Sequence, residues 1–143
     1  MFFGKFYHSI DQKGRMRIPA KLRHGLGERF FVLRGTSKCL YVCPQELFDE
    51  LKEKFSQAPL YDVALQETIR AIMSTGQDIE EDNQGRFLLD SDLRKLINID
   101  KDVVFVGAGR KIELWSKEEW EKENAKIEEN YNEALGNLAN LGI

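Results

Sequence analysis

The sequence repeats itself, and this internal repeat restricts the possible folds more than any other feature. Residues 11–23 align with residues 82–94 at an offset of 71, with an Asp, a Gly and an Arg in the same places. The similarity continues at an offset of 73, where the apolar run at 31–33 aligns with 104–106. Ordered matches of this kind indicate a duplicated structural unit, and two copies are too few for a solenoid.

Both copies have the same predicted order of elements: a strand, a turn at Asp-x-x-Gly, a second strand, a short helix and a hairpin of two strands. Gly14 and Gly85 stand where the turn needs a positive φ, at which a side chain is costly. Pro19 opens the short helix of the first copy, and Asp90 or Ser91 caps its equivalent. The predicted strands are 4–10, 14–18, 30–34 and 38–43, then 77–81, 85–89, 103–107 and 111–115.

Neither copy is large enough to fold alone, because about 40 residues with four short strands bury too little apolar surface. The two copies are therefore expected to share one core around a pseudo-twofold axis, in a mainly β fold with helices (α+β). Apolar periodicity predicts further helices at 44–55, 62–74 and 117–141. The predicted divisions are repeat 1 (1–47), a helical linker (48–75), repeat 2 (76–119) and a C-terminal amphipathic helix (120–143). The last helix either docks on a neighbouring subunit or packs on its own domain.

Charge is divided unevenly along the chain. The formal net charge is −3, which by itself disfavours binding to a polyanion. Residues 1–40, however, contain nine Lys or Arg and two acidic residues, a net charge of +7, whereas the rest carries −10. This asymmetry indicates a polyanion-binding end, with chance clustering on a soluble surface as the alternative.

The basic residues concentrate at the first Asp-x-x-Gly turn. Period-2 alternation directs Met16 and Ile18 to the core and Arg15 and Arg17 to the outer face. An arginine fork binds phosphate or guanine, and a two-stranded ribbon fits the major groove of DNA. This basic hairpin is therefore a candidate DNA-binding element. Further basic residues near it are Lys13 at the turn, Lys21 and Arg23 on the short helix, and Lys5 on the preceding strand.

The second copy serves as an internal comparison. It keeps the Asp and Arg of the turn as Asp82 and Arg86, which indicates that the Asp-x-x-x-Arg pair is partly architectural. Arg15 can therefore pair with Asp11 in a purely structural role, which is the alternative to DNA contact. The second copy lacks the other basic residues and has Gln84, Leu88, Asp90 and Asp92 in place of Lys13, Arg17, Pro19 and Lys21.

No motif of an enzyme, a cofactor site or a metal site is present. Cys39 and Cys43 lie about 13 Å apart along one predicted strand, too far for a disulfide, and are expected to be small buried hydrophobes. A zinc site with His8 and His24, or a cation on the acidic run 78–82, remains the weaker alternative. No apolar run approaches the roughly 20 residues of a membrane span, and the N-terminus lacks the layout of a signal peptide.

The stretch Asp11-x-Lys-Gly-Arg-x-x-Ile-Pro19 resembles the SpoVT–AbrB group of bacterial regulators. Two copies with Asp-x-x-x-Arg in a chain beginning Met-Phe-Phe-Gly resemble the MraZ family over nearly the whole length. The resemblance implies a swapped-hairpin, double-ψ-like β-barrel and a cytoplasmic, nucleoid-associated regulator of the division and cell-wall gene cluster, including its own operon. It also implies a ring of subunits on direct repeats in promoter DNA. The residues of the family's motif carry over to Asp11, Lys13 and Arg15, and to Asp82 and Arg86.

The sequence therefore predicts a sequence-specific DNA-binding repressor that assembles into a homo-oligomer and has no cofactor, small-molecule substrate or membrane partner. The rival classes are an antitoxin-like module that binds a protein partner, and a ligand-binding or enzymatic barrel, for which no convergent polar set is evident. The predicted DNA-binding residues are Lys5, Lys13, Arg15, Arg17, Lys21, Arg23 and Arg86, and the predicted structural residues of the motif are Asp11, Gly14, Asp82 and Gly85.

Overall fold

The computed structural model describes residues 1–143 as an α+β fold, as predicted, with the same order of elements in both repeats. Repeat 1 contains β1 (Phe2–Ser9), β2 (Arg15–Arg17), α1 (Ala20–Arg23), the 3₁₀ helix η1 (His24–Leu26), β3 (Phe30–Arg34) and β4 (Leu40–Pro44). The linker contains α2 (Gln45–Ser56) and α3 (Val63–Met73). Repeat 2 contains β5 (Gln77–Asp78), β6 (Arg86–Leu88), α4 (Ser91–Leu96), β7 (Asp102–Gly109) and β8 (Lys111–Ser116). The chain ends with α5 (Lys117–Ala134) and the 3₁₀ helix η2 (Leu135–Leu141).

The two repeats exchange strands. Six strands form one antiparallel sheet in the order β1-β7-β8-β4-β3-β5, and β2 and β6 form a separate antiparallel pair. The first strand of each repeat lies on the third strand of the other, since β1 pairs with β7 and β5 pairs with β3. The six-stranded sheet is open, so hydrogen bonds do not close the strands into a complete barrel.

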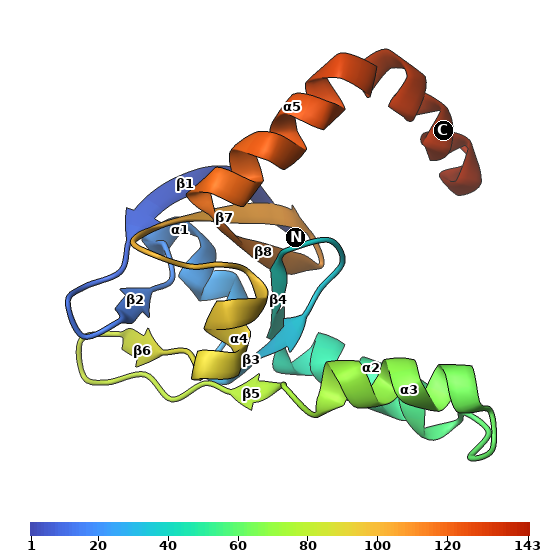
Figure 1. Cartoon of the computed structure of the whole chain (residues 1–143), viewed down its shortest axis with the longest axis horizontal. Helices are drawn as coiled ribbons and strands as arrows, with labels where there is room; N and C mark the ends of the chain where they lie inside the picture. Colours follow the sequence, from blue (N-terminus) through green and yellow to red (C-terminus); the bar gives the residue numbers. More distant parts are fainter.

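The expectation that the strands on either side of the first turn form one ribbon is wrong. β2 pairs with β6 of the other repeat, with Met16 opposite Phe87, while β1 runs along β7. Figure 1 shows β2 and β6 side by side at the edge of the molecule, each preceded by its turn. The exchange joins the strands that follow the two Asp-x-x-Gly turns into one antiparallel pair, which we call the β2–β6 ribbon (residues 15–17 and 86–88) and which has one turn at each end.

A single core lies between the repeats. Equivalent residues of the two copies are buried in the same cluster, including Leu22 and Leu93, which are 3% and 0% exposed. Phe30 of repeat 1 packs edge-to-face on Phe87 of repeat 2, with ring centroids 5.9 Å apart. Because each copy supplies part of one apolar cluster, the predicted shared core is confirmed.

Two helical segments project from this core (Figure 1). One is the pair α2 and α3; the other is α5, whose first part packs on β7 and β8 with Trp120 against Trp115. The predicted continuous helix over 117–141 is wrong, because the backbone is non-helical at Asn130 and the last turns are the 3₁₀ helix η2. No helix is both long and apolar enough to span a bilayer.

Both cysteines are free and buried, as the sequence predicted. Burial raises the pKa of the Cys39 and Cys43 thiols to about 12, so both carry their proton at neutral pH. They act as small apolar side chains rather than nucleophiles.

Candidate nucleic-acid interface

The first turn is organised around the carboxylate of Asp11. Its Oδ1 accepts hydrogen bonds from the backbone N–H groups of Lys13 and Arg15, both at 2.9 Å, and its Oδ2 accepts from Nε of Arg15 at 2.7 Å. Gly14 donates its N–H to the carbonyl of Asp11 and has a φ of 80°. An Asp and a Gly at these positions satisfy the polar groups and the backbone conformation of the turn.

The second turn has nearly the same geometry. Asp82 accepts from the backbone N–H groups of Gln84 and Arg86 at 2.9 Å and from Nε of Arg86 at 2.8 Å. Gly85 has a φ of 76° and donates to the carbonyl of Asp82. Since both copies keep this network although the basic residues differ, the Asp and the Gly form the turn itself.

The same network orients the arginine of each turn. Nε of Arg15 is fixed by Asp11, whereas its two Nη groups have no hydrogen-bond partner, and the side chain is 29% exposed. Arg86 has the same arrangement and is 28% exposed. A guanidinium held at one nitrogen and open at the other two can bind an incoming acceptor with little loss of conformational entropy.

The outer face of the β2–β6 ribbon gathers these arginines. Met16 and Phe87 point into the core, so Arg15, Arg17, Arg86 and Leu88 lie on the opposite face. Arg17 is paired directly with Arg86, and Arg15 with Leu88. Like charges opposite each other destabilise a ladder unless an anion compensates them.

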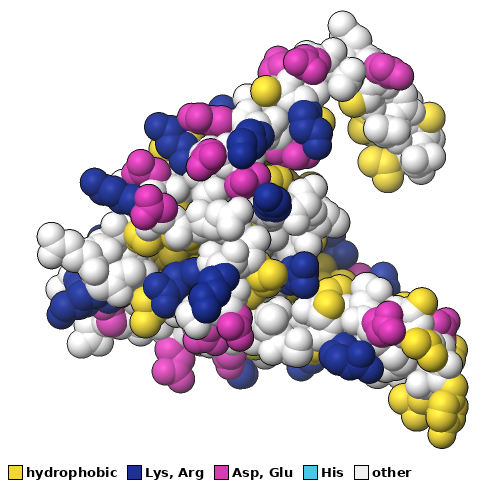
Figure 2. Space-filling model, in the orientation of Figure 1, with side chains coloured by type: hydrophobic (Ala, Val, Ile, Leu, Met, Phe, Trp, Pro, Cys, Tyr) yellow, Lys and Arg dark blue, Asp and Glu magenta, His cyan; other side chains and the backbone are white.

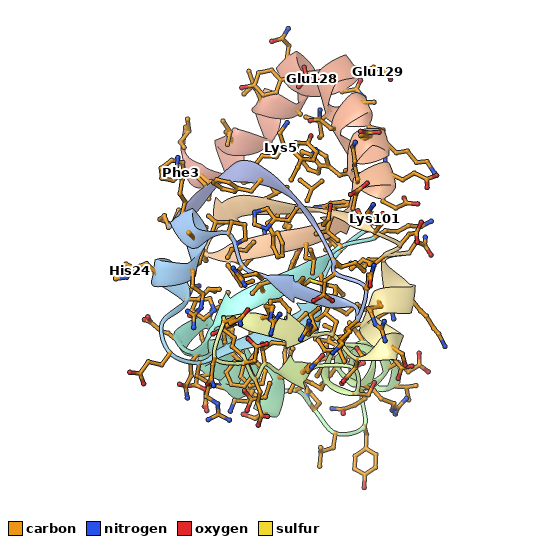
Figure 3. The ribbon with its side chains drawn as sticks, turned by 90° about the vertical axis from the view of Figure 1, so that its left-hand side faces the viewer. Phe3, Lys5, His24, Lys101, Glu128 and Glu129 are labelled. Carbon is orange, nitrogen blue, oxygen red and sulfur yellow. The ribbon has the colours of Figure 1, made fainter.

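The other predicted residues divide into three groups. Lys13, Lys21 and Arg17 are exposed, and none of them forms an ion pair. Arg23 donates to Glu81 at 2.6 Å and to the Gly27 carbonyl, so its charge is compensated within the protein. Figure 3 shows that Lys5 lies beneath α5, where its ammonium group is 5.7 Å from the Trp120 ring, so the structure does not bring Lys5 to the ribbon.

Two basic residues beside the first turn were missed by the sequence analysis. Arg94 of α4 and Lys101, in the loop before β7, line one hollow together with Lys13. Figure 2 shows Lys and Arg side chains grouped over α4 and toward the loop between β1 and β2. At the offset of 71, Arg94 is equivalent to Arg23, and Ile10 stands where the second copy has Glu81. The absence of an acid at position 10 was the signal in the sequence that could have identified Arg94.

Nowhere does the structure bring together three His, Cys, Asp or Glu side chains in a group that could hold a metal ion. The acidic run before the second turn is used in ion pairs, since Asp78 binds Arg29 and Glu81 binds Arg23. The ribbon is therefore a cationic surface suited to an anionic partner.

We expect the carboxylates of both turns to remain ionised in mild acid. The pKa of Asp11 lies below the ordinary 3.8, chiefly because the backbone N–H of Arg15 donates to the carboxylate, and Asp82 is held the same way by Arg86. A lowered folded-state pKa stabilises the turn above the unfolded value, and this contribution is lost as the pH falls through the folded value.

An NMR titration of the carboxyl carbons checks this expectation. In Arg15→Ala, the pKa of Asp11 is expected to rise only in part, because the largest cause is a backbone N–H that the substitution keeps. The pKa of Asp82 is the internal control and should not change. A complete return of Asp11 to 3.8 would contradict the backbone account of the turn.

Comparison with known proteins gives one family. The family model described as "MraZ protein, putative antitoxin-like" matches residues 1–70 and 72–139, one range for each repeat. The chain is 40% identical over 141 residues to a protein of Desulforamulus reducens, covering 99% of both chains. It is 39% identical to one of Clostridium tetani and 38% identical to one of Desulfitobacterium hafniense, covering both chains completely. All three relatives are named "Transcriptional regulator MraZ".

Proposed function

The chain belongs to the MraZ family and is a transcriptional regulator, and we propose that it acts by binding promoter DNA through the basic face of its β2–β6 ribbon. The contacts come from Lys13, Arg15 and Arg17, with a weaker contribution from Arg86, which lies opposite Arg17. Lys21 adds a phosphate contact beside the ribbon, whereas Arg23 acts through its ion pair and Lys5 does not take part.

The observation that carries this proposal is the set of arginine N–H donors left free on the outer face of the ribbon, although Arg15 and Arg86 are each held at Nε by an Asp. Arg17 faces Arg86 across the ladder, and the Nη groups of Arg15 and Arg86 have no partner in the protein. Asp82 compensates Arg86 in part, whereas Arg17 forms no ion pair, and a phosphate oxygen between the two can accept from both. A ribbon of this size also fits the major groove, where arginine forks can reach O6 and N7 of guanine.

We further propose that several subunits bind together, as a ring on direct repeats. One ribbon with about five phosphate contacts gives weak binding, and joining subunits raises the effective concentration of each further contact. Exposed apolar side chains on the projecting segments support an assembly, since isolated surfaces rarely keep such groups in water. They include Leu60 and Tyr61 between α2 and α3, Val63 at the start of α3, Tyr131 in α5, and Leu141 and Ile143 at the C-terminal end.

The proposed regulatory role is repression of the chain's own operon within the division and cell-wall gene cluster, at the nucleoid in the cytoplasm. A complex that covers promoter elements blocks the polymerase. The family relationship supports this role.

A gel shift with the DNA upstream of the chain's own gene tests the proposal. We expect a retarded complex that unrelated duplex of the same length does not displace, and a light-scattering mass that is a multiple of the 16.6 kDa chain. Binding that is equally strong on both duplexes would contradict specific recognition. A mass of one chain in light scattering, with the same specific retarded complex, would contradict the assembly.

The family description and the exposed C-terminal segment also favour a second candidate, a protein partner docked on α5 and η2. The two candidates predict different effects of removing residues 135–143. A docked partner protein is lost on this removal, whereas DNA contact by a single ribbon is retained.

A further inference from the structure

Two arginines at the same place in the two repeats have different surroundings. Arg23 donates to both carboxylate oxygens of Glu81. Arg94 is its equivalent in α4, but the residue equivalent to Glu81 is Ile10, which has no acceptor. Nε of Arg94 is buried without any hydrogen-bond partner. A buried polar group without a partner is costly, so the guanidinium of Arg94, unlike that of Arg23, is not satisfied within the chain.

The two turns consequently carry opposite charges over their glycines. A Cβ placed on Gly14 would lie 3.3 Å from Nη1 of Arg94, so the guanidinium sits directly over the first turn. At Gly85 the nearest polar atom is a carboxylate oxygen of Glu81, at 3.9 Å. The first turn therefore presents a cation to an approaching anion, and the second turn presents a carboxylate.

Arg94 opens into a hollow beside the first turn with a volume of about 550 Å³. Lys13 and Lys101 contribute two further positive charges to its lining, and Lys101 is placed by the hydrogen bond from Ile10 N–H to its carbonyl at 2.9 Å. Figure 3 labels Lys101 on this side of the molecule. Two carboxylates also line the hollow: Asp11, whose oxygens are occupied by the turn, and the exposed Asp100. The lining is therefore cationic on balance.

We propose that this hollow binds a phosphate group of the DNA backbone, with Arg94 as the main donor and Lys13 and Lys101 as flanking charges. A phosphate oxygen in the hollow can accept from the Nη groups of Arg94, one of which lies over Gly14, and three cations outweigh the remaining carboxylate. The second turn has no such site, because the equivalent arginine, Arg23, already donates its hydrogen bonds to Glu81. This assignment rests on the proposed DNA binding and adds a reason why the first repeat is the DNA-contacting side.

The substitution Arg94→Gln tests the site, with Arg23→Gln as its matched control. A phosphate contact carries no sequence information, so Arg94→Gln is expected to weaken binding about tenfold on both upstream and unrelated duplex DNA. The slope of log K against log [salt] is expected to become shallower by about 0.9 for each bound subunit. Arg23→Gln is expected to leave both affinity and slope unchanged. Equal effects of the two substitutions, or an unchanged slope in Arg94→Gln, would overturn the proposal.

Two further variants keep the test decisive if Arg94→Gln is unstable. Ile10→Glu supplies for Arg94 the carboxylate that Glu81 supplies for Arg23. It is expected to compensate the charge of Arg94 and to make the slope of log K against log [salt] shallower, as Arg94→Gln does. Lys101 is exposed, so Lys101→Gln should fold normally and also make the slope shallower. Unchanged slopes in both variants, while the wild-type chain still binds its DNA, would reject the phosphate site alone. Failure of the wild-type chain to bind DNA at all would reject the proposed function itself.

Discussion

Arg15→Ala is expected to abolish specific DNA binding while the protein stays folded and assembled. The substitution removes the guanidinium whose Nη groups have no hydrogen-bond partner in the protein, and a good bidentate contact to a base contributes about 1–3 kcal/mol. Losses multiply when several subunits bind one DNA molecule, so even the lower value eliminates the specific complex. The turn survives because Asp11 still accepts the backbone N–H groups of Lys13 and residue 15.

The matched control is Arg86→Ala, which removes the same side chain from the same hydrogen-bond network in the second turn. We expect a smaller loss of affinity, since the carboxylate of Glu81 lies beside that turn and Lys13 has no basic equivalent there. Gel shifts measure the affinity, and circular dichroism confirms the fold. Equal losses in the two variants, or unfolding of Arg15→Ala, would show that the arginines are structural in both repeats.

Leu93→Ala is expected to have the largest effect on stability. Leu93 is fully buried in the core that the two repeats share. Removing its methyl groups costs about 2–5 kcal/mol through lost transfer energy and the cavity left behind, a large part of the roughly 5–15 kcal/mol that stabilises a typical domain. Thermal or denaturant unfolding at matched protein concentration measures the loss.

Leu22→Ala, at the equivalent place in the first repeat, tests whether the core is one cooperative unit. Trp115 and Trp120 both lie in the second half of the chain and report its unfolding by fluorescence. Because the core is shared, Leu22→Ala is expected to lower the midpoint reported by these tryptophans, in a single transition that coincides with circular dichroism. A tryptophan signal that does not respond to Leu22→Ala would mean that the repeats fold independently.

Much of this fold follows from the sequence repeat. The repeat predicted two copies with the same order of elements, and the burial of Leu22 and Leu93 together confirms their common core. The choice of strand partner did not follow from the residues themselves, since β2 and β6 offer similar ladders whether they pair with their own repeat or with the other; only the family resemblance implied a swapped hairpin. The break at Asn130 was also missed, because the apolar spacing of 117–141 fits a continuous helix and residues 117–130 contain no Pro or Gly.

The site was predicted less completely than the fold. The alternation around Met16 placed Arg15 and Arg17 correctly on the exposed face. Lys5 was assigned to the site by its proximity in sequence, but β1 pairs with β7 and carries Lys5 to Trp120. Arg23 was assigned to the DNA-binding site by its charge alone, because its ion-pair partner Glu81 comes 58 residues later in the sequence. Arg94 was overlooked because its importance depends on Ile10 standing where the other repeat has an acid.

Photo-crosslinking at the tips of the two turns tests most directly whether the first repeat contacts DNA. Gln12 and Asn83 are equivalent, exposed residues, so a photo-reactive residue can replace either one without disturbing the core. We predict that the probe at position 12 crosslinks to the upstream duplex and that the probe at position 83 crosslinks much less. Efficient crosslinking only from position 83, or from neither position while the complex still forms, would contradict the assignment of DNA binding to the first turn.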